Sequence, residues 1–488
     1  MINNPIQREE GAEMKAMNLN HLHPMGPATQ TSPGMDTNLV TSRFQWPDTP
    51  VEWARAIREA PYRSYLYSYP HKTAYRSFDT PLPLQKLWEK EELESYFLYM
   101  HIPFCAARCG FCNLFTLPDK RQDVHKEYVD ALERQARQWA PIMGGRPFSR
   151  FAIGGGTPTL LEAPLVERLF DIAENIMGLD PKRASISVET SPDTVTEDRL
   201  EVLKRRGTDR VSMGIQSFVE SESAAIYRPQ KPKLVREALE RLVEYNFPLL
   251  NVDLIYGLPG QTVETWLYSL EEALSYSPGE IFLYPLYIRE NTILKPGYTG
   301  LDHDIRLSLY EVARERLKQA GYVQYSMRRF AKNEGTSSKE LLPYSCQEEG
   351  MAGLGCGARS YTRDVHYASR YGVSTAATRS IIADYVAAER HDLADYGFIL
   401  NADERKRRFI LKALLHREGL ELCAYAERFG VSLEDDFTGM SLLLESGMAV
   451  VEEGTLRLTE EGMAYSDAIG DWMISTSVRE RMEGYVGA

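Results

Sequence analysis

The sequence predicts an α/β fold, in which helices cover a parallel sheet, followed by a smaller helical domain. From Tyr96 onward, short β-branched or aromatic runs alternate with longer helical patterns, which is typical of βα repeats. After residue 400 the pattern changes to three helices and a hairpin. The chain has 488 residues, more than the about 250 to 300 that one core usually holds, so we expect at least two domains.

The residues before the sheet divide into two parts. Residues 1–48 are rich in Pro, Gly, Ser, Thr and Asn and have no sustained apolar period, which predicts a flexible N-terminal arm. Residues 49–95 include the tyrosine-rich stretch "YLYSYPHKTAYR" at 65–76. This stretch either passes near a functional site or only packs on the following domain. We expect His71 within it to be a surface residue rather than a proton donor.

The core domain is expected at residues 96–330, where six strand-like runs alternate with helical patterns. Tandem βα repeats imply a parallel sheet, but their periodicity leaves open whether the sheet is doubly wound or a partial barrel. The six predicted strands are "YFLYMHI" at 96–102, "RFAI" at 150–153, "SISVE" at 185–189, "RVSMGI" at 210–215, "LLNVDLI" at 249–255 and "IFLYPLYI" at 281–288.

A connecting region at residues 331–400 leads to a winged-helix-like domain at 401–475. Three helical patterns precede "MAVVEEGTLRL", which predicts a hairpin turning at Glu453 and Gly454. Thr459 is expected to cap the last helix. Winged helices often bind DNA, but the acidic "EDD" and "EE" patches and the lack of a basic stripe argue against it here.

Charge and hydropathy limit the classes of binding partner and predict the cellular compartment. Lys+Arg 56 against Asp+Glu 69 gives a net charge of −13, which disfavours nucleic acid and anionic membranes as partners. No signal-peptide pattern and no run of eighteen apolar residues occurs, so we expect a cytoplasmic chain without a membrane span. In that reducing compartment, clustered cysteines hold metal or carry out redox chemistry more often than they form disulfides.

Three of the six cysteines, Cys105, Cys109 and Cys112, lie within "YMHIPFCAARCGFC". This loop follows a predicted strand at the carboxyl end, where βα folds build their sites. Three thiolates can hold three irons of a 4Fe–4S cluster and leave the fourth iron open to another ligand. The alternatives are three buried structural cysteines, or a zinc site with His101 as the nearest fourth ligand. The cysteines without motif spacing are expected to be small buried side chains or loop residues: Cys346, Cys356 and Cys423.

A glycine-rich turn, "AIGGGTPTL", ends the second predicted strand. Consecutive glycines let the backbone approach a ligand closely, and we expect Thr157 and Pro158 to open a helix whose amino end favours a carboxylate. Such a turn is a weak signal alone. Its proximity to the cysteine loop strengthens it.

Taken together, these motifs resemble the radical S-adenosylmethionine enzymes, and most closely the branch containing oxygen-independent coproporphyrinogen III oxidase. The likeness runs from about Tyr65 to about Ser475 and implies a partial (β/α)6 barrel. The motifs that carry it are "YMHIPFC", "GGGTPT", Glu189 in "SISVETSPDTV", Gln216 in "MGIQSF", Arg228, "DLIYGLPGQT" at 253–262 and "GLGCGARS" at 353–360.

The resemblance assigns roles to residues. It implies that Cys105, Cys109 and Cys112 ligate a 4Fe–4S cluster, and that S-adenosylmethionine completes the open iron. Arg228 would suit a carboxylate held bidentately. One or two molecules of S-adenosylmethionine would be bound by Tyr99, Gly155, Gly156, Thr157, Glu189, Gln216, Arg228 and Asp253. The acids and the amide also have a rationale of their own, since each lies at or near the end of a predicted strand.

Two departures from the oxidase bear on the reaction. Leu114 stands where the oxidase has a further cysteine, and Pro285 where the oxidase has a small residue, so we predict that the chain does not decarboxylate coproporphyrinogen. The resemblance implies an enzyme that acts on a tetrapyrrole or another large planar small molecule, by oxidation or carbon methylation. Reduced flavodoxin or ferredoxin would supply electrons. The alternative is a haem-binding carrier, like the haem chaperones of the same branch.

Overall fold

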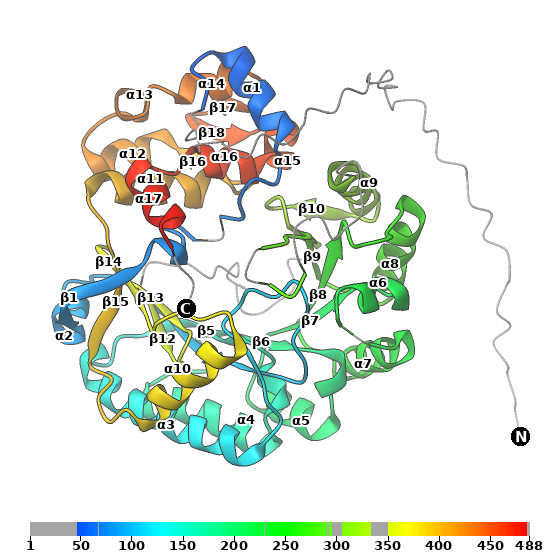
Figure 1. Cartoon of the computed structure of the whole chain (residues 1–488), viewed down its shortest axis with the longest axis vertical. Coiled ribbons are helices and arrows are strands. Elements are labelled where there is room, and N and C mark those ends of the chain that lie inside the picture. The colour runs from blue at the N-terminus through cyan, green and yellow to red at the C-terminus, as the bar shows by residue number, and fades with distance from the viewer. Residues whose placement is uncertain are drawn as a thin grey trace, which may run out of the picture. The chain divides into compact units, whose positions relative to one another are not determined.

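The structure is a computed structural model that describes residues 46–66, 68–228, 230–289, 292–294, 305–332 and 350–485. Nearly all of the predicted N-terminal arm lies outside the described residues, as does Cys346. Figure 1 shows a curved sheet with helices on its outer side.

Six parallel strands form the centre of a 13-stranded sheet and confirm the six predicted strands. Their order follows the sequence, as expected when each strand returns beside the last through a covering helix. Most side chains on both faces are buried, so the strands are rich in apolar residues, with polar residues at a few positions. The strands are β2 (Tyr96–Ile102), β5 (Phe148–Gly155), β6 (Ser185–Thr190), β7 (Arg210–Gln216), β8 (Leu249–Tyr256) and β9 (Glu280–Pro285).

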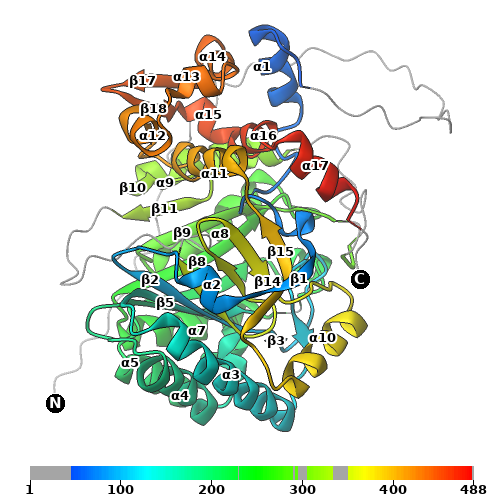
Figure 2. The same cartoon turned by 90° about the vertical axis from the view of Figure 1, so that its left-hand side faces the viewer.

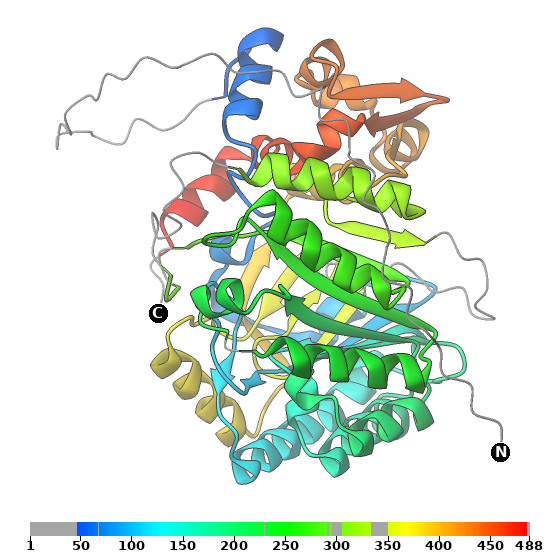
Figure 3. The same cartoon turned by 90° about the vertical axis from the view of Figure 1, so that its right-hand side faces the viewer.

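The helices between these strands lie on the outer, convex side, and Figure 3 shows those after β6 in green. The arrangement is an α/β fold with a partial barrel, as predicted. The covering helices are α3 (Gln122–Met143), α4 (Ala163–Asp171), α5 (Glu197–Arg205), α6 (Glu220–Ala225), α7 (Pro232–Tyr245), α8 (Val263–Ser275) and α9 (Arg306–Gln319).

The sheet continues beyond the barrel on both sides. The region predicted only as a connection forms β12 (Met351–Leu354), β13 (Arg359–Tyr361), β14 (Val365–Ala368), α10 (Thr375–Ala387) and β15 (Leu393–Ile399). Strand β12 runs parallel to β2, and the next three are antiparallel. The outermost strands are β1 (Arg76–Pro83), which precedes α2 (Leu84–Trp88) and pairs with β15, and β11 (Arg329–Lys332) and β10 (Tyr322–Gln324), which follow β9.

A second hydrophobic core contains the C-terminal elements and the N-terminal helix α1 (Pro50–Glu59). Figure 2 shows α1 in blue beside the red C-terminal helices. The predicted hairpin is confirmed, with its turn at Glu453 and Gly454, and the Thr459 hydroxyl caps the next helix by accepting from the Gly462 amide at 3.1 Å. The C-terminal elements are α11 (Ala402–Leu414), β16 (Leu420–Glu421), α12 (Leu422–Phe429), α13 (Leu433–Asp436), α14 (Met440–Glu445), β17 (Ala449–Glu452), β18 (Thr455–Leu458), α15 (Glu460–Ala464), α16 (Ser466–Trp472) and α17 (Thr476–Glu483).

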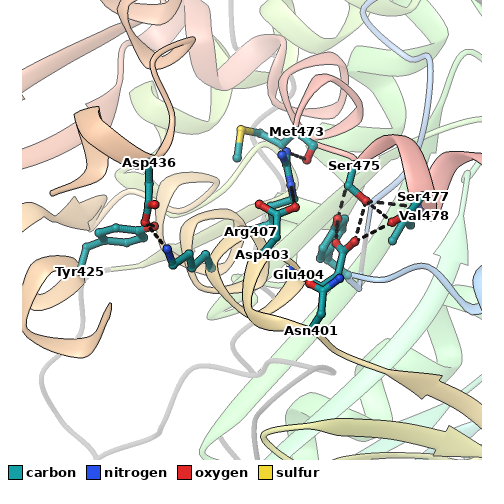
Figure 4. A network of polar contacts seen from close by, with 12 residues as sticks. Asn401, Asp403, Glu404, Arg407, Tyr425, Asp436, Met473, Ser475, Ser477 and Val478 are labelled. Carbon is teal, nitrogen blue, oxygen red and sulfur yellow. Dashed lines mark hydrogen bonds and ion pairs between the residues drawn. The ribbon is translucent and has the colours of Figure 1, made fainter. Parts of the chain in front are cut away.

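A buried carboxylate joins the N-terminal segment to this second core. Glu404 on α11 accepts hydrogen bonds from the hydroxyls of Ser475 at 2.7 Å, Ser477 at 2.9 Å and Tyr69, as Figure 4 shows for the two serines. Because Glu404 is only 1% exposed, removing these donors would leave a buried charge without partners. The tyrosine-rich stretch is therefore held by the C-terminal helices. The domain boundaries given above stay a prediction.

Candidate functional site

The cysteine loop begins and ends in a short parallel pair, β3 (Phe104–Cys105) with β4 (Leu117–Pro118). Its middle is held by two backbone hydrogen bonds, from the Gly110 amide to the Ile226 carbonyl at 2.8 Å and from the Leu294 amide to the Gly110 carbonyl at 2.9 Å. The loop is thus fixed at both ends and at its centre. A rigid loop of this kind can present several ligands in a constant arrangement.

Each of the three thiols is half-buried and has a hydrogen-bond donor beside it. The Arg228 guanidinium donates to Cys109 Sγ at 3.4 Å, the Thr157 hydroxyl donates to Cys105 Sγ at 3.9 Å, and the Thr116 hydroxyl lies 3.9 Å from Cys112 Sγ. Burial raises the pKa of Cys105 to about 12, so its thiolate form needs a bound metal or a nearby cation. Three thiols on one fixed loop, with donors for their sulfurs, fit a 4Fe–4S cluster.

The alternative, a zinc site, would lack its proposed fourth ligand, His101. His101 uses both ring nitrogens: Nε2 donates to the Phe115 carbonyl at 2.9 Å, so Nδ1 accepts from the Tyr99 hydroxyl at 3.2 Å. Burial lowers the pKa of His101 to about 4, and the ring is neutral at pH 7. Among the described residues, no three Cys, His, Asp or Glu side chains converge on one metal ion. A cluster, which offers a separate iron to each thiol, suits this spacing better.

The glycine turn is required by packing. Gly155 has φ +119°, and a Cβ there would lie 2.6 Å from Cε1 of His101. A Cβ on Gly156 would lie 2.5 Å from the Phe104 carbonyl oxygen. The expected helix amino end is wrong, since Pro158 opens only a 3-10 turn of three residues (Pro158–Leu160) and α4 begins at Ala163. The turn brings the backbone close to the cysteine loop, with no helix directed at a ligand.

Two acids and an amide lie on three neighbouring strands. Glu189 is the penultimate residue of β6 and accepts from the Gly155 amide at 2.9 Å, while burial raises its pKa. Asp253 lies in the middle of β8, not at its end, and accepts from Asn251 Nδ2 at 2.8 Å; burial raises its pKa to about 6. Gln216 ends β7 with φ 71°. The ionised form of Glu189 is stabilised by the Gly155 amide, and that of Asp253 by the charge of Arg210 and then by the Asn251 donor.

Arg228 is engaged more fully than the sequence suggests. Besides Cys109, its guanidinium donates to the Gly214 carbonyl at 2.6 Å and to Gln230 Oε1 at 3.0 Å. Three of its five N–H groups therefore already have acceptors. One N–H group on each terminal nitrogen therefore remains for a ligand.

These residues surround a cavity of about 380 Å³, a size typical of small-molecule sites. Six of the predicted site residues line it directly: Tyr99, Cys112, Gly155, Glu189, Gln216 and Asp253. The other five, Cys105, Cys109, Gly156, Thr157 and Arg228, are not among its lining residues and belong to the cysteine loop, the glycine turn or their immediate contacts.

The cavity is also lined by residues for which the sequence predicted no role. Lys72, Arg289 and Arg359 line it, together with a group of aromatic side chains. The aromatic residues are Tyr65, Tyr75, Phe111, Phe115, Tyr284, Tyr287, Tyr371 and Tyr396. The basic residues come from three separate segments. In the sequence, Lys72 belongs to the tyrosine-rich stretch and Arg359 to "GLGCGARS", but neither motif gave these residues a role.

The tyrosine-rich stretch both passes the site and packs on the protein, since Tyr65, Lys72 and Tyr75 line the cavity and Tyr69 lies in the second core. The surface position expected for His71 is wrong: the side chain is 7% exposed, and its Nδ1 accepts from the Thr73 amide. Burial lowers the pKa of His71 well below its ordinary value, so the ring is neutral. His71 does not line the cavity.

The remaining cysteines of the described residues lie outside the cavity. Cys356 is buried and confirms the expectation of a small core side chain, whereas Cys423 is exposed on α12 rather than in a loop. No helix among the described residues is long and apolar enough to cross a membrane.

The partial barrel and the three-cysteine loop define a radical S-adenosylmethionine protein. The family model "Radical SAM superfamily" matches residues 99–273, and "HemN C-terminal domain" matches residues 400–465. The chain belongs to this superfamily, and within it to the family of the oxygen-independent coproporphyrinogen III oxidase and the heme chaperone HemW. The resemblance stated from the sequence is confirmed. Membership implies a 4Fe–4S cluster and binding of S-adenosylmethionine.

Two curated relatives and one solved structure support this assignment. Heme chaperone HemW of Escherichia coli is 32% identical over 262 residues, which are 54% of this chain and 68% of that protein. The oxygen-independent coproporphyrinogen III oxidase of Salmonella typhimurium is 27% identical over 439 residues, 84% of this chain and 93% of the relative. The solved structure of coproporphyrinogen III oxidase (HemN) from Escherichia coli has a TM-score of 0.70 at 24% identity, covering 86% of this chain and 98% of that one. The last comparison supports the fold.

Proposed function

We propose that the chain is a radical S-adenosylmethionine enzyme that acts on a tetrapyrrole or another large planar molecule, by oxidation or carbon methylation. The observation that carries the proposal is that the cysteine loop, the glycine turn and the polar ends of the strands meet at one cavity. When bound, the cluster and S-adenosylmethionine supply a 5'-deoxyadenosyl radical that takes hydrogen from a substrate carbon. Reduced flavodoxin or ferredoxin would be the electron donor.

In this proposal, Cys105, Cys109 and Cys112 hold the cluster, and Arg228 places a positive charge beside one of its sulfurs. The hydrogen bond keeps the guanidinium 3.4 Å from Cys109 Sγ. The Thr157 hydroxyl, a neutral group, donates a hydrogen bond to Cys105 Sγ. The protein thereby stabilises negative charge at the loop.

The cofactor cradle would consist of Tyr99, the glycine turn with Thr157, and the polar residues of β6, β7 and β8. Glu189 and Asp253 offer carboxylate oxygens to N–H and O–H groups, and the Gln216 amide can donate or accept. Glu189 is fixed by the Gly155 amide at 2.9 Å, so it is oriented before any ligand binds. The cradle would bind one molecule of S-adenosylmethionine or two, and a binding titration distinguishes these stoichiometries.

The substrate side of the cavity favours a flat, partly apolar molecule. Tyr65 stacks on Tyr287 with ring centroids 5.7 Å apart and an interplanar angle of 11°. Tyr284, which also lines the cavity, stacks on Phe282 at 5.9 Å. Aromatic surfaces of this kind bind planar ring systems by offset stacking.

The test is 5'-deoxyadenosine release by anaerobically reconstituted protein supplied with a reductant and S-adenosylmethionine. We expect slow release without substrate, faster release with a suitable tetrapyrrole, and none from Cys112→Ala. Titration of S-adenosylmethionine into the same protein gives the number of molecules bound. Wild-type protein that carries a full cluster but releases no 5'-deoxyadenosine under any reductant would contradict the proposal.

Leu114 and Pro285 both line the cavity, at the positions where the sequence departs from the oxidase. We therefore expect no conversion of coproporphyrinogen III to protoporphyrinogen IX, since two groups that face the substrate differ. A mass spectrum showing loss of two carboxyl groups, faster than in the Cys112→Ala variant, would overturn this expectation.

A haem carrier is the second candidate, favoured by the 32% identity with heme chaperone HemW of Escherichia coli. Leu114 is compatible with it, because the carriers resembled by this sequence also lack the further cysteine. Tight stoichiometric haem binding, together with no 5'-deoxyadenosine release with or without haem, would favour the carrier over the enzyme.

A further inference from the structure

Arg108 lies inside the cysteine loop, directly before Cys109, and none of the roles described above uses it. Its Nε–H is buried, yet this donor finds no acceptor within the part of the chain that the structure describes. Buried donors in native proteins nearly always have a partner, which is a protein group, an ordered water or a ligand. The place of this donor, between two of the three cysteines, points to a ligand that the cysteines hold.

The backbone on both sides of Arg108 is fixed. Cys105 precedes it and belongs to β3, which pairs with β4. Gly110 follows it and makes two backbone hydrogen bonds, to the Ile226 carbonyl at 2.8 Å and from the Leu294 amide at 2.9 Å. The arginine side chain therefore leaves the loop from a constant position, which a group that acts on a bound ligand needs.

The charge of Arg108 reaches Cys112, the third cysteine of the loop. Burial is the main influence on this thiol and raises its pKa, while the charge of Arg108 acts in the opposite direction. Such an effect requires the guanidinium to lie near the sulfur, because water and salt screen charges that are farther apart. The guanidinium is thus directed toward the thiols rather than away from them.

Each of the three thiols already has another hydrogen-bond donor beside it. The pairs are Arg228 with Cys109, Thr157 with Cys105 and Thr116 with Cys112. A 4Fe–4S cluster brings inorganic sulfides, which are acceptors that the protein itself does not have. Hydrogen bonds to the sulfurs of such clusters, together with net charge and solvent exposure, determine their reduction potential.

A cation at this place has a defined electrical effect on the cluster. In the one-electron reduction, a reduced flavodoxin or ferredoxin is oxidised by one electron and the cluster becomes more negative by one charge. A positive charge nearby stabilises the reduced form more than the oxidised form, and so raises the reduction potential. Arg108 keeps its proton throughout, because arginine is always protonated at neutral pH.

We infer that Arg108 donates its Nε–H to a sulfur of the bound cluster and raises the reduction potential of that cluster. The inference rests on the cluster of the proposed function and is independent of the substrate. Arg228 is a poorer residue for testing it, because its guanidinium also donates to the Gly214 carbonyl and to Gln230. Replacing Arg108 changes the surroundings of the cluster and leaves these contacts of the barrel in place.

The test is a redox titration, followed by electron paramagnetic resonance, of anaerobically reconstituted protein in the absence of S-adenosylmethionine. In Arg108→Gln, which removes the charge, we expect the ratio of reduced to oxidised cluster at a fixed potential to fall about tenfold. For a one-electron couple this is a shift of about 59 mV to more negative potential. Arg108→Lys, which retains the charge, should recover part of the shift. An unchanged potential in Arg108→Gln would overturn the inference.

The matched control is Arg379→Gln, which removes an exposed cation on α10 and should leave the potential as in wild type. An equal shift in the control would overturn the inference. Iron and sulfide assays check that each variant carries a full cluster. If Arg108→Gln takes up no cluster, Arg108→Lys decides: a full cluster close to the wild-type potential upholds the role of the charge. Any other result in the lysine variant would then assign Arg108 to the structure of the loop and overturn the inference.

A second measurement separates the cluster from the carboxylate of S-adenosylmethionine as the acceptor. Affinity for S-adenosylmethionine, measured by calorimetry, should be the same in Arg108→Gln as in wild type. A loss of this affinity at an unchanged potential would assign Arg108 to the cofactor and overturn the inference. Release of 5'-deoxyadenosine by wild type with excess chemical reductant tests the proposed function separately, so the inference can fail while the proposed function stands.

Discussion

Replacing Gly155 by Ala should weaken the fold at the centre of the site. The residue has φ +119°, a conformation that costs an L-residue about 1–3 kcal/mol. The new Cβ would lie 2.6 Å from the His101 ring, and that ring is held on both sides, by Tyr99 and by the Phe115 carbonyl. Moving it loses a hydrogen bond of about 1 kcal/mol. The free energy of unfolding should therefore fall by about 2–4 kcal/mol.

Urea denaturation followed by circular dichroism measures this loss, with Gly145→Ala as the matched control. Gly145 also has a positive φ, +74°, but a Cβ there meets nothing within 4 Å, so only the backbone cost of about 1–2 kcal/mol applies. The difference between the two variants reports the contact with His101. Equal losses in both would refute the claim that His101 packing, beyond backbone strain, requires glycine at position 155.

Three further predictions concern charge and metal. Burial raises the pKa of Asp253 to about 6 in the folded protein, so this group ionises first in the unfolded chain as pH rises. The free energy of unfolding should therefore fall by about 3 kcal/mol between about pH 4 and 6, and Asp253→Asn should abolish this fall. Urea midpoints across that window check this, and an unchanged slope would contradict it. Asp467→Asn breaks the buried ion pair with Arg328 and should lower the free energy of unfolding by about 3–5 kcal/mol in the same assay. The control Asp403→Asn breaks a half-exposed pair and should cost under about 1 kcal/mol. Similar losses in the two variants would count against burial as the cause. Cys105→Ala should lose iron by colorimetric assay, while Cys423→Ala, exposed on α12, should retain it; a full cluster in the first variant would rule out its ligand role.

The barrel was predictable from sequence because its strands are buried on both faces. A parallel strand covered by helices is largely apolar, and the runs at β2 and β8 show this without knowledge of their neighbours, apart from polar residues such as Asp253 that line the cavity. The strands β12 to β14 have three or four residues each and gain their place by pairing beside β2, which is far away in the sequence. Such short segments carry too little periodicity to be recognised locally.

The site residues likewise differ in how far the sequence predicts them, depending on whether they belong to a local motif. The cysteine loop and the glycine turn are local motifs, so the residues closest to the proposed cluster could be named from sequence. Lys72, Arg289 and Arg359 have no common motif, and only the closure of the sheet brings them together. His71 shows the converse error: a polar residue in a tyrosine-rich stretch looks exposed, yet tertiary contacts bury it.

The C-terminal helices contribute to the cavity although none of their residues lines it. Asp467 on α16 accepts hydrogen bonds from the Tyr287 hydroxyl and from Arg328, at 2.5 Å for the arginine, and the Arg328 guanidinium lies 4.0 Å from the centre of the Tyr65 ring. Both tyrosines form the stacked wall on the substrate side. The cysteine loop, in contrast, is held at Gly110 by residues of the barrel. Because the two sides of the cavity have different supports, a change in the C-terminal helices can alter which substrate fits while the cluster loop keeps its structure.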